Sequence, residues 1–176
     1  GKGIRYADSI LKLLQQKDLN RYKIRTKFSA YFFVEHYKTN VFNTLPLLRE
    51  TFKEGLENGD SDFTAFVGNA YVQNSFLTGS KLSELNVEIR RQLQYNLQVK
   101  NLTSKTFSDI YCQYAACLQG DAEQVHTLSG KYFNAETEVP NLLAINNKGG
   151  LNNYHFSQAF LKLLFGRFDE AVTEIS

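Results

Sequence analysis

The sequence contains no methionine and no tryptophan, and it has only two prolines and two cysteines among 176 residues. Proline interrupts regular helices, so its scarcity leaves long stretches free to be helical. No apolar run approaches the roughly 20 residues that a membrane-spanning helix needs, and the N-terminus lacks the apolar core of a secretory signal. These absences favour a soluble helical protein. Because no methionine is present to start translation, we expect the chain to be a piece of a larger protein.

The charge of the chain is nearly balanced, with 20 lysines and arginines against 18 aspartates and glutamates, a formal net charge of +2. Such a balance gives no bulk attraction to nucleic acid or to an anionic membrane. One basic stretch has Lys17, Arg21 and Arg25 at four-residue spacing, with Tyr22 among them. Basic residues beside aromatics can bind nucleic acid, but this spacing is also typical of a solvated helix face. We therefore expect neither nucleic acid nor a membrane as partner.

The two cysteines, Cys112 and Cys117, are separated by five positions. Five residues turn a helix through about 500°, so two thiols at this spacing point in different directions and cannot form a disulfide or clip a metal ion. We expect both to be buried, reduced thiols. Reduced thiols are typical of the cytoplasm, which is the location we predict.

Residues that suit a left-handed helix end recur along the chain. Gly79, Gly120 and Gly166 each follow a strongly apolar stretch, and Asn40 occupies the corresponding place earlier. Glycine and asparagine tolerate the left-handed conformation in which helices commonly end. These four positions lie 39, 41 and 46 residues apart. A period near forty residues indicates a helical repeat.

The expected helices follow from these stops and from apolar residues at helical spacing. Pro140 and the asparagines around it indicate a long connection over residues 133–147. The sequence therefore predicts one all-α domain over residues 1–176, an α-solenoid of stacked antiparallel helical hairpins. Its expected elements are a first helix at about 4–16, then pairs at 20–38 with 43–57, 61–78 with 82–98, 105–118 with 121–132, and 150–165 with 167–175.

The segment from Leu164 to Val172 resembles the turn of a tetratricopeptide repeat. In this motif a glycine ends the first helix, an aromatic residue follows two positions later, and an alanine stands three positions further on. Gly166, Phe168 and Ala171 match these three positions. The resemblance implies that the solenoid is tetratricopeptide-like.

A longer pattern is formed by Leu45-Pro46-Leu47-Leu48, by Gly55 to Asp60, by Phe63-Thr64-Ala65-Phe66 and by Ser75 to Leu85. In its residues, spacing and order this pattern resembles the helical region of large bacterial, cyanobacterial-type multi-sensor signal-transduction kinases. In that family this region follows an AAA-type ATPase core and precedes GAF-type sensory and histidine-kinase modules. The similarity covers most of the chain from about residue 20 and implies a scaffold or protein-interaction segment.

No catalytic or cofactor-binding residue is predicted. The sequence lacks the phosphate-binding pattern Gly-x-x-x-x-Gly-Lys-Ser/Thr and the catalytic motifs of kinases. Glu35-His36 could begin a metal-hydrolase motif, but Asn40 stands where its second histidine is required. His126 and His155 have no partner at metal-ligand spacing. We therefore expect no metal ion and no cofactor.

Four tyrosines on the expected first helices form the candidate partner-binding surface: Tyr71, Tyr111, Tyr114 and Tyr154. Tyrosine offers apolar contact with a polar tip, although tyrosines on such helices are usually core residues. The leading hypothesis is a non-catalytic scaffold or interaction segment of a signalling ATPase or sensor kinase, whose partner is a neighbouring module or another protein. The alternatives are a stand-alone tetratricopeptide-like adaptor that binds peptides and, third, a helical enzyme with an unrecognised site.

Overall fold

The computed structural model of the chain describes residues 1–16 and 19–175. All regular structure in these residues is helical, apart from one isolated bridge between Ser129 and Asn134, so the all-α prediction is confirmed. The α-helices are α1 (Lys2–Gln16), α2 (Asn20–Phe33), α3 (Thr44–Asn58), α4 (Ser61–Leu77), α5 (Leu82–Gln98), α6 (Leu102–Gln119), α7 (Ala135–Ala144), α8 (Lys148–Leu164) and α9 (Phe168–Ile175). Two short 3₁₀ helices, η1 (Glu35–Tyr37) and η2 (Val41–Asn43), connect α2 to α3.

The chain divides into two compact units, an N-terminal unit of residues 1–85 and a C-terminal unit of residues 86–176. The boundary lies inside α5, just after Leu85. No proline- or glycine-rich linker marks it, which is why the sequence indicated a single domain. No helix in the described ranges is long and apolar enough to cross a membrane.

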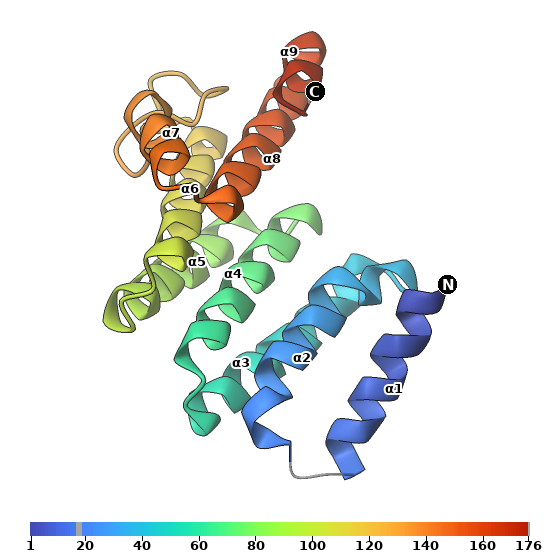
Figure 1. Cartoon of the computed structure of the whole chain (residues 1–176). Helices are drawn as coiled ribbons and strands as arrows, with labels where there is room; N and C mark the ends of the chain where they lie inside the picture. Colours follow the sequence, from blue (N-terminus) through green and yellow to red (C-terminus); the bar gives the residue numbers. More distant parts are fainter. Residues whose placement is uncertain (17–18, 176) are drawn as a thin grey trace. The chain divides into compact units, whose positions relative to one another are not determined.

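The N-terminal unit is organised around α2, which contacts α1, α3 and α4 (Figure 1). Its core is a cluster of buried apolar residues from these helices, Ile24, Leu48, Val67 and Ala70, with aromatic side chains packed against it. Helices α3 and α4 also approach closely at Gly55, where a Cβ would collide with the side chain of Thr64. Only glycine fits there, so its lack of a side chain brings these two helices together.

The predicted left-handed helix ends are confirmed at all three glycines. The φ angles are +70° at Gly79, +78° at Gly120 and +74° at Gly166. Gly59 adds a fourth such position, with a φ of +73° at the end of α3. The prediction for Asn40 is wrong, because its φ is −62° and its side chain instead accepts a hydrogen bond from the Phe42 amide at the start of η2.

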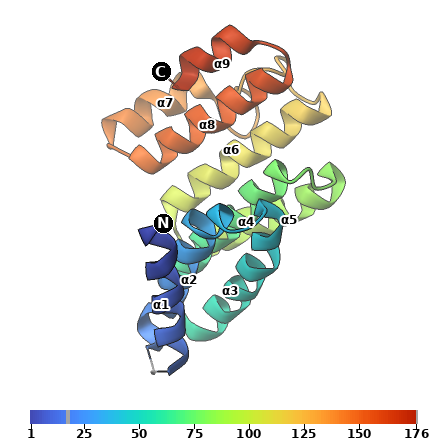
Figure 2. The ribbon, with the colours of Figure 1, turned by 90° about the vertical axis from the view of Figure 1, so that its right-hand side faces the viewer.

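In the C-terminal unit, α8 contacts α6, α7 and α9 (Figure 2). Helices α5 and α6 are joined by buried polar side chains. The Asn96 amide donates to the carbonyl oxygen of Ser104 at 2.9 Å and to the Ser108 hydroxyl at 2.8 Å, and it accepts from Gln92 at 2.8 Å. Asn96 is fully buried, so these bonds offset the cost of removing its amide from water.

The helix predicted over residues 121–132 does not form. This segment is irregular and runs on to Asn134, where α7 begins. In a helix the amide of Leu128 would donate to the carbonyl of Gln124, but here it donates to the Gln158 side chain. Tertiary hydrogen bonds therefore override the local helical tendency of the segment.

The connection predicted over residues 133–147 is also wrong, because α7 occupies most of it and contains Pro140. Asn134 caps this helix by accepting a hydrogen bond from the Glu136 amide at 3.0 Å. Proline inside a helix removes one backbone hydrogen bond. Leu142 is buried, and packing of α7 against α8 offsets that loss.

Candidate binding pocket

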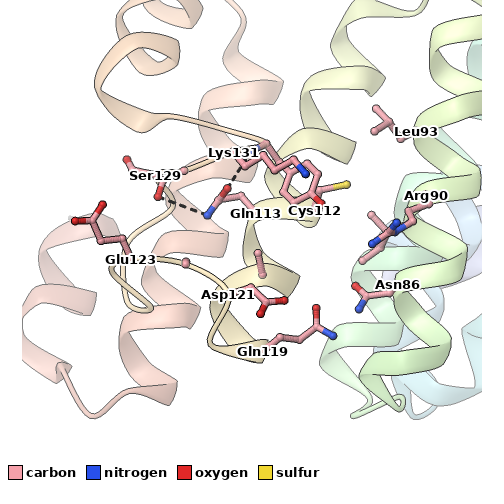
Figure 3. A pocket seen from close by; sticks show the side chains of 15 residues that line it. Asn86, Arg90, Leu93, Cys112, Gln113, Gln119, Asp121, Glu123, Ser129 and Lys131 are labelled. Carbon is pink, nitrogen blue, oxygen red and sulfur yellow. Dashed lines mark hydrogen bonds between the residues drawn. The ribbon is translucent and has the colours of Figure 1, made fainter.

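A pocket of about 430 Å³ lies within the C-terminal unit, between α5, α6 and the segment of residues 121–132 (Figure 3). We call residues 121–134 the clamped loop, because side chains of α6 and α8 hold it by hydrogen bonds. The size of the pocket lies in the range of small-molecule and side-chain binding sites. Three separate elements thus supply its walls.

The floor of the pocket is buried and mostly apolar. It contains Ile89 from α5 with Cys112 and Ala116 from α6, all of them less than a tenth exposed. Burial, together with the nearby Asp109, raises the pKa of the Cys112 thiol to about 11, although Arg90 acts in the opposite direction. The thiol is therefore protonated at neutral pH. The prediction that both cysteines are free, buried thiols is confirmed.

The rim of the pocket carries charges of both signs. Arg90 on α5 and Lys131 on the clamped loop supply the cations, and Asp121 and Glu123 supply the anions. All four residues are exposed, and within residues 1–16 and 19–175 none of them forms an ion pair. Lys131 lies 5.3 Å from the centre of the Tyr132 ring, a weak cation–π contact.

Gln113 fixes one side of the clamped loop. Its side-chain oxygen accepts a hydrogen bond from the Tyr132 amide at 3.1 Å, and its side-chain nitrogen donates to the carbonyl oxygen of Ser129 at 3.5 Å (Figure 3). Gly130 lies against this amide, so closely that a Cβ there would be 2.6 Å from the Gln113 nitrogen. Gln113 is 1% exposed, which makes these bonds inaccessible to competing water.

Gln158 fixes the same loop from α8. Its side-chain nitrogen donates to the carbonyl oxygen of His126, and its side-chain oxygen accepts from the Leu128 amide, both at 2.7 Å. Leu128 and Gln158 are both buried. Two buried glutamines from different helices thus hold a segment without regular secondary structure, and the pocket wall that it forms is preorganised.

The four candidate tyrosines are divided between the two units, with Tyr71 in the N-terminal unit and the other three in the C-terminal unit. Tyr111 and Tyr114 are 3% exposed and burial raises the pKa of both, so they are core residues with no surface to offer a partner. Tyr71 belongs to the N-terminal unit, where the Arg49 guanidinium lies 4.9 Å from its ring centre and donates to its hydroxyl. Tyr154 is half-buried, stacks on Phe133, and has its pKa raised to about 12 by burial. Among these four, none lines the pocket.

The histidines have local partners. His36 contacts the Phe32 carbonyl oxygen at 3.2 Å, His126 contributes its own carbonyl to Gln158, and His155 lies 3.1 Å from a carboxylate oxygen of Glu174. Across the described ranges, no group of three or more His, Cys, Asp or Glu side chains is placed to hold a metal ion.

The basic stretch is partly described. Lys17 lies outside the described residues. Arg21 lies 5.8 Å from the ring centre of Tyr22, and Arg25 lies 4.5 Å from that of Phe63. Both arginines are exposed but lie against aromatic rings of their own unit.

A second, more open pocket lies in the N-terminal unit. It is lined by residues around η1 and η2 and by the end of α4, including His36, Phe42 and Leu77. Phe42 is 61% exposed and none of the lining residues is buried, so this pocket lacks the buried floor of the pocket in the C-terminal unit. The latter is the stronger candidate site.

The sequence did not indicate the residues of this pocket. Arg90 and Lys131 were surface charges without a motif, and Gln113 was a polar residue on an apolar helix. The available signal was Gly130 beside Ser129, a pair typical of a turn, inside a segment interpreted as helical.

Comparisons of the chain with models of protein families, with curated proteins and with solved structures find no match.

Proposed function

We propose that the chain is a non-catalytic helical-repeat scaffold whose C-terminal unit binds a segment of another protein or of a neighbouring module. The observation that carries this proposal is the pocket between α5, α6 and the clamped loop, which combines a buried apolar floor with an exposed charged rim. Apolar anchoring with a few polar groups for orientation is the usual design of a binding site. Preorganisation by two buried glutamines limits the entropy lost on binding.

The chemistry of the floor favours binding over catalysis. A nucleophilic cysteine needs a pKa below its ordinary value, because the thiolate is the reactive form. The pKa of Cys112 moves in the opposite direction, to about 11. This supports the scaffold over the hypothesis of a helical enzyme with an unrecognised site.

Left-handed glycines between consecutive helices support a tetratricopeptide-like α-solenoid as the finer description of the fold. Together with the resemblance to multi-sensor kinases, they favour a scaffold that lies between the modules of a signalling ATPase or sensor kinase in the cytoplasm. A stand-alone peptide-binding adaptor is the second candidate, and the same pocket supports it. The two differ in whether the bound segment belongs to the same polypeptide.

The absence of tryptophan from the chain allows a direct test. In Asn86→Trp the only indole lies at the pocket, whereas in Val87→Trp it lies at the next position of α5, which is 56% exposed and does not line the pocket. Peptides are first selected by phage display on the wild-type chain. We expect an enriched peptide family that shifts the indole emission of Asn86→Trp and leaves that of Val87→Trp unchanged.

Two results would count against the proposal. One is a display experiment that enriches no peptide family. The other is a selected family that changes both emissions equally or neither, because the peptides would then bind away from the pocket.

A further inference from the structure

Some opposite charges in the described structure pair with one another. Lys27 lies 2.7 Å from Glu54, and Lys162 lies 2.7 Å from Glu174. Around the pocket, by contrast, two cations and two anions line one cavity, and none of them forms an ion pair with another residue that the structure describes. Their charges remain available to a bound molecule.

From this arrangement we propose that the pocket selects a peptide segment of bipolar charge, with an acidic and a basic residue on either side of an apolar side chain. The inference rests on the proposed function and specifies its ligand. The apolar side chain would contact Leu93, a partly exposed apolar residue of the lining, and Ala116. A carboxylate would pair with Arg90 or Lys131, and an ammonium or guanidinium group with Asp121 or Glu123.

Arg90 and Asp121, which carry opposite charges, lie on different walls of the pocket. Arg90 lies one helical turn after Asn86 on α5, and Figure 3 shows its guanidinium on the α5 side of the cavity. Asp121 follows Gly120, the residue that caps the end of α6, and lies at the other wall. A ligand that satisfies both must carry its own charges apart from each other, which also fixes its direction.

A ligand of one charge sign fits this rim poorly. A polyanion such as nucleic acid would meet Asp121 and Glu123, and a strongly basic peptide would meet Arg90 and Lys131. Juxtaposed like charges oppose binding and so contribute to specificity. The formal net charge of +2 gives no bulk attraction that would offset this repulsion.

The test uses three pools of fluorescein-labelled peptides of about nine residues and the full wild-type chain. Each pool has an equal mixture of Leu, Phe and Tyr at its centre. The flanking positions carry one Glu and one Lys in the bipolar pool, in both orders, only Glu in the acidic pool, and only Lys in the basic pool. Fluorescence anisotropy should show that the bipolar pool binds at least about ten-fold more tightly than either other pool.

Charge reversal identifies the residues. Arg90→Glu should weaken binding of the bipolar pool about ten-fold and strengthen binding of the basic pool, a gain that simple damage to the fold would not produce. The matched control is Arg91→Glu at the next position of α5, where the native side chain pairs with Glu88 at 3.1 Å and does not line the pocket. This control should bind all three pools as the wild type does.

The outcomes separate the two proposals. Equal binding of the three pools, or the same response from Arg90→Glu and Arg91→Glu, overturns the bipolar ligand, while a positive result with the Asn86→Trp variant would still support a peptide-binding pocket. If no pool binds and display enriches no family, both proposals fail.

Discussion

Replacing Gln158 with leucine should loosen the clamped loop without changing the volume of the side chain greatly. The substitution removes two hydrogen bonds of 2.7 Å, one to the His126 carbonyl oxygen and one from the Leu128 amide. Leu128 is fully buried, so water cannot replace the partner of its amide. The carbonyl of His126 belongs to a partly exposed residue and can be rehydrated.

These two losses differ in size. Leaving a buried amide unsatisfied costs about 1–3 kcal/mol, and losing a hydrogen bond that water can replace costs about 0.5–1.5 kcal/mol. We therefore expect Gln158→Leu to lower the free energy of unfolding by about 2–4 kcal/mol. Greater exchange of the Leu128 amide should accompany this change, since its present acceptor is gone.

The assay combines urea unfolding with amide hydrogen exchange. Exchange is measured for single amides, so it reports on the C-terminal unit separately from the N-terminal unit. Gln98→Leu is the matched control, because Gln98 is exposed at the end of α5 and its loss should cost less than about 0.5 kcal/mol. The reasoning is refuted if Gln158→Leu is as stable as this control and the Leu128 amide remains protected.

Three further predictions concern other parts of the fold. Gly120→Val should cost about 1–2 kcal/mol in urea unfolding because its φ of +78° strains a β-branched residue, and an unchanged stability would contradict the left-handed helix end. Ala70→Leu should overpack the core of the N-terminal unit and lower the free energy of unfolding by about 1–3 kcal/mol. The control Glu57→Leu on the surface should lower it by less than about 0.5 kcal/mol, and equal effects would exclude a tightly packed core around Ala70. Burial alone would raise the pKa of Glu174, but hydrogen bonds from Lys162 and His155 lower this pKa below its ordinary value. The ionised carboxylate therefore stabilises the fold at pH values above the ordinary pKa. This stabilisation is lost as the pH falls through the lowered pKa. Glu174→Gln should therefore weaken the acid dependence of unfolding below the ordinary glutamate pKa of about 4.3, and an undiminished dependence would exclude this carboxylate as its source.

Local signals predicted most of the helices well. Residues at helical spacing and glycines that suit a left-handed end located α3, α4, α5, α8 and α9 to within about two residues, since both signals act over a few positions of the chain. The end of α2 was placed too late because Asn40 was given the role of a terminator, whereas its side chain caps η2.

The pocket depends on long-range interactions, and this explains why the sequence did not reveal it. The segment after Gly120 has helical spacing of Val125 and Leu128, but its conformation is decided by Gln113 and Gln158, which lie on other helices. The hydrogen bond between the Gln158 side chain and the Leu128 amide joins residues 30 positions apart, so it produces no periodic pattern in the sequence. For the same reason Pro140 was interpreted as a break, although packing of α7 sustains a helix through it.

The contact between Gly130 and Gln113 has an evolutionary consequence. A side chain at position 130 would occupy the space of the Gln113 amide, since its Cβ would lie 2.6 Å from the nitrogen and 2.9 Å from the oxygen of that group. A descendant or relative of this chain could accept a larger residue at 130 only if the Gln113 amide moved away or position 113 became shorter. Position 113 would then no longer reach the Tyr132 amide, and the loop would need another anchor. Substitutions at these two positions should therefore be inherited together, and intermediates carrying only the first should be rare.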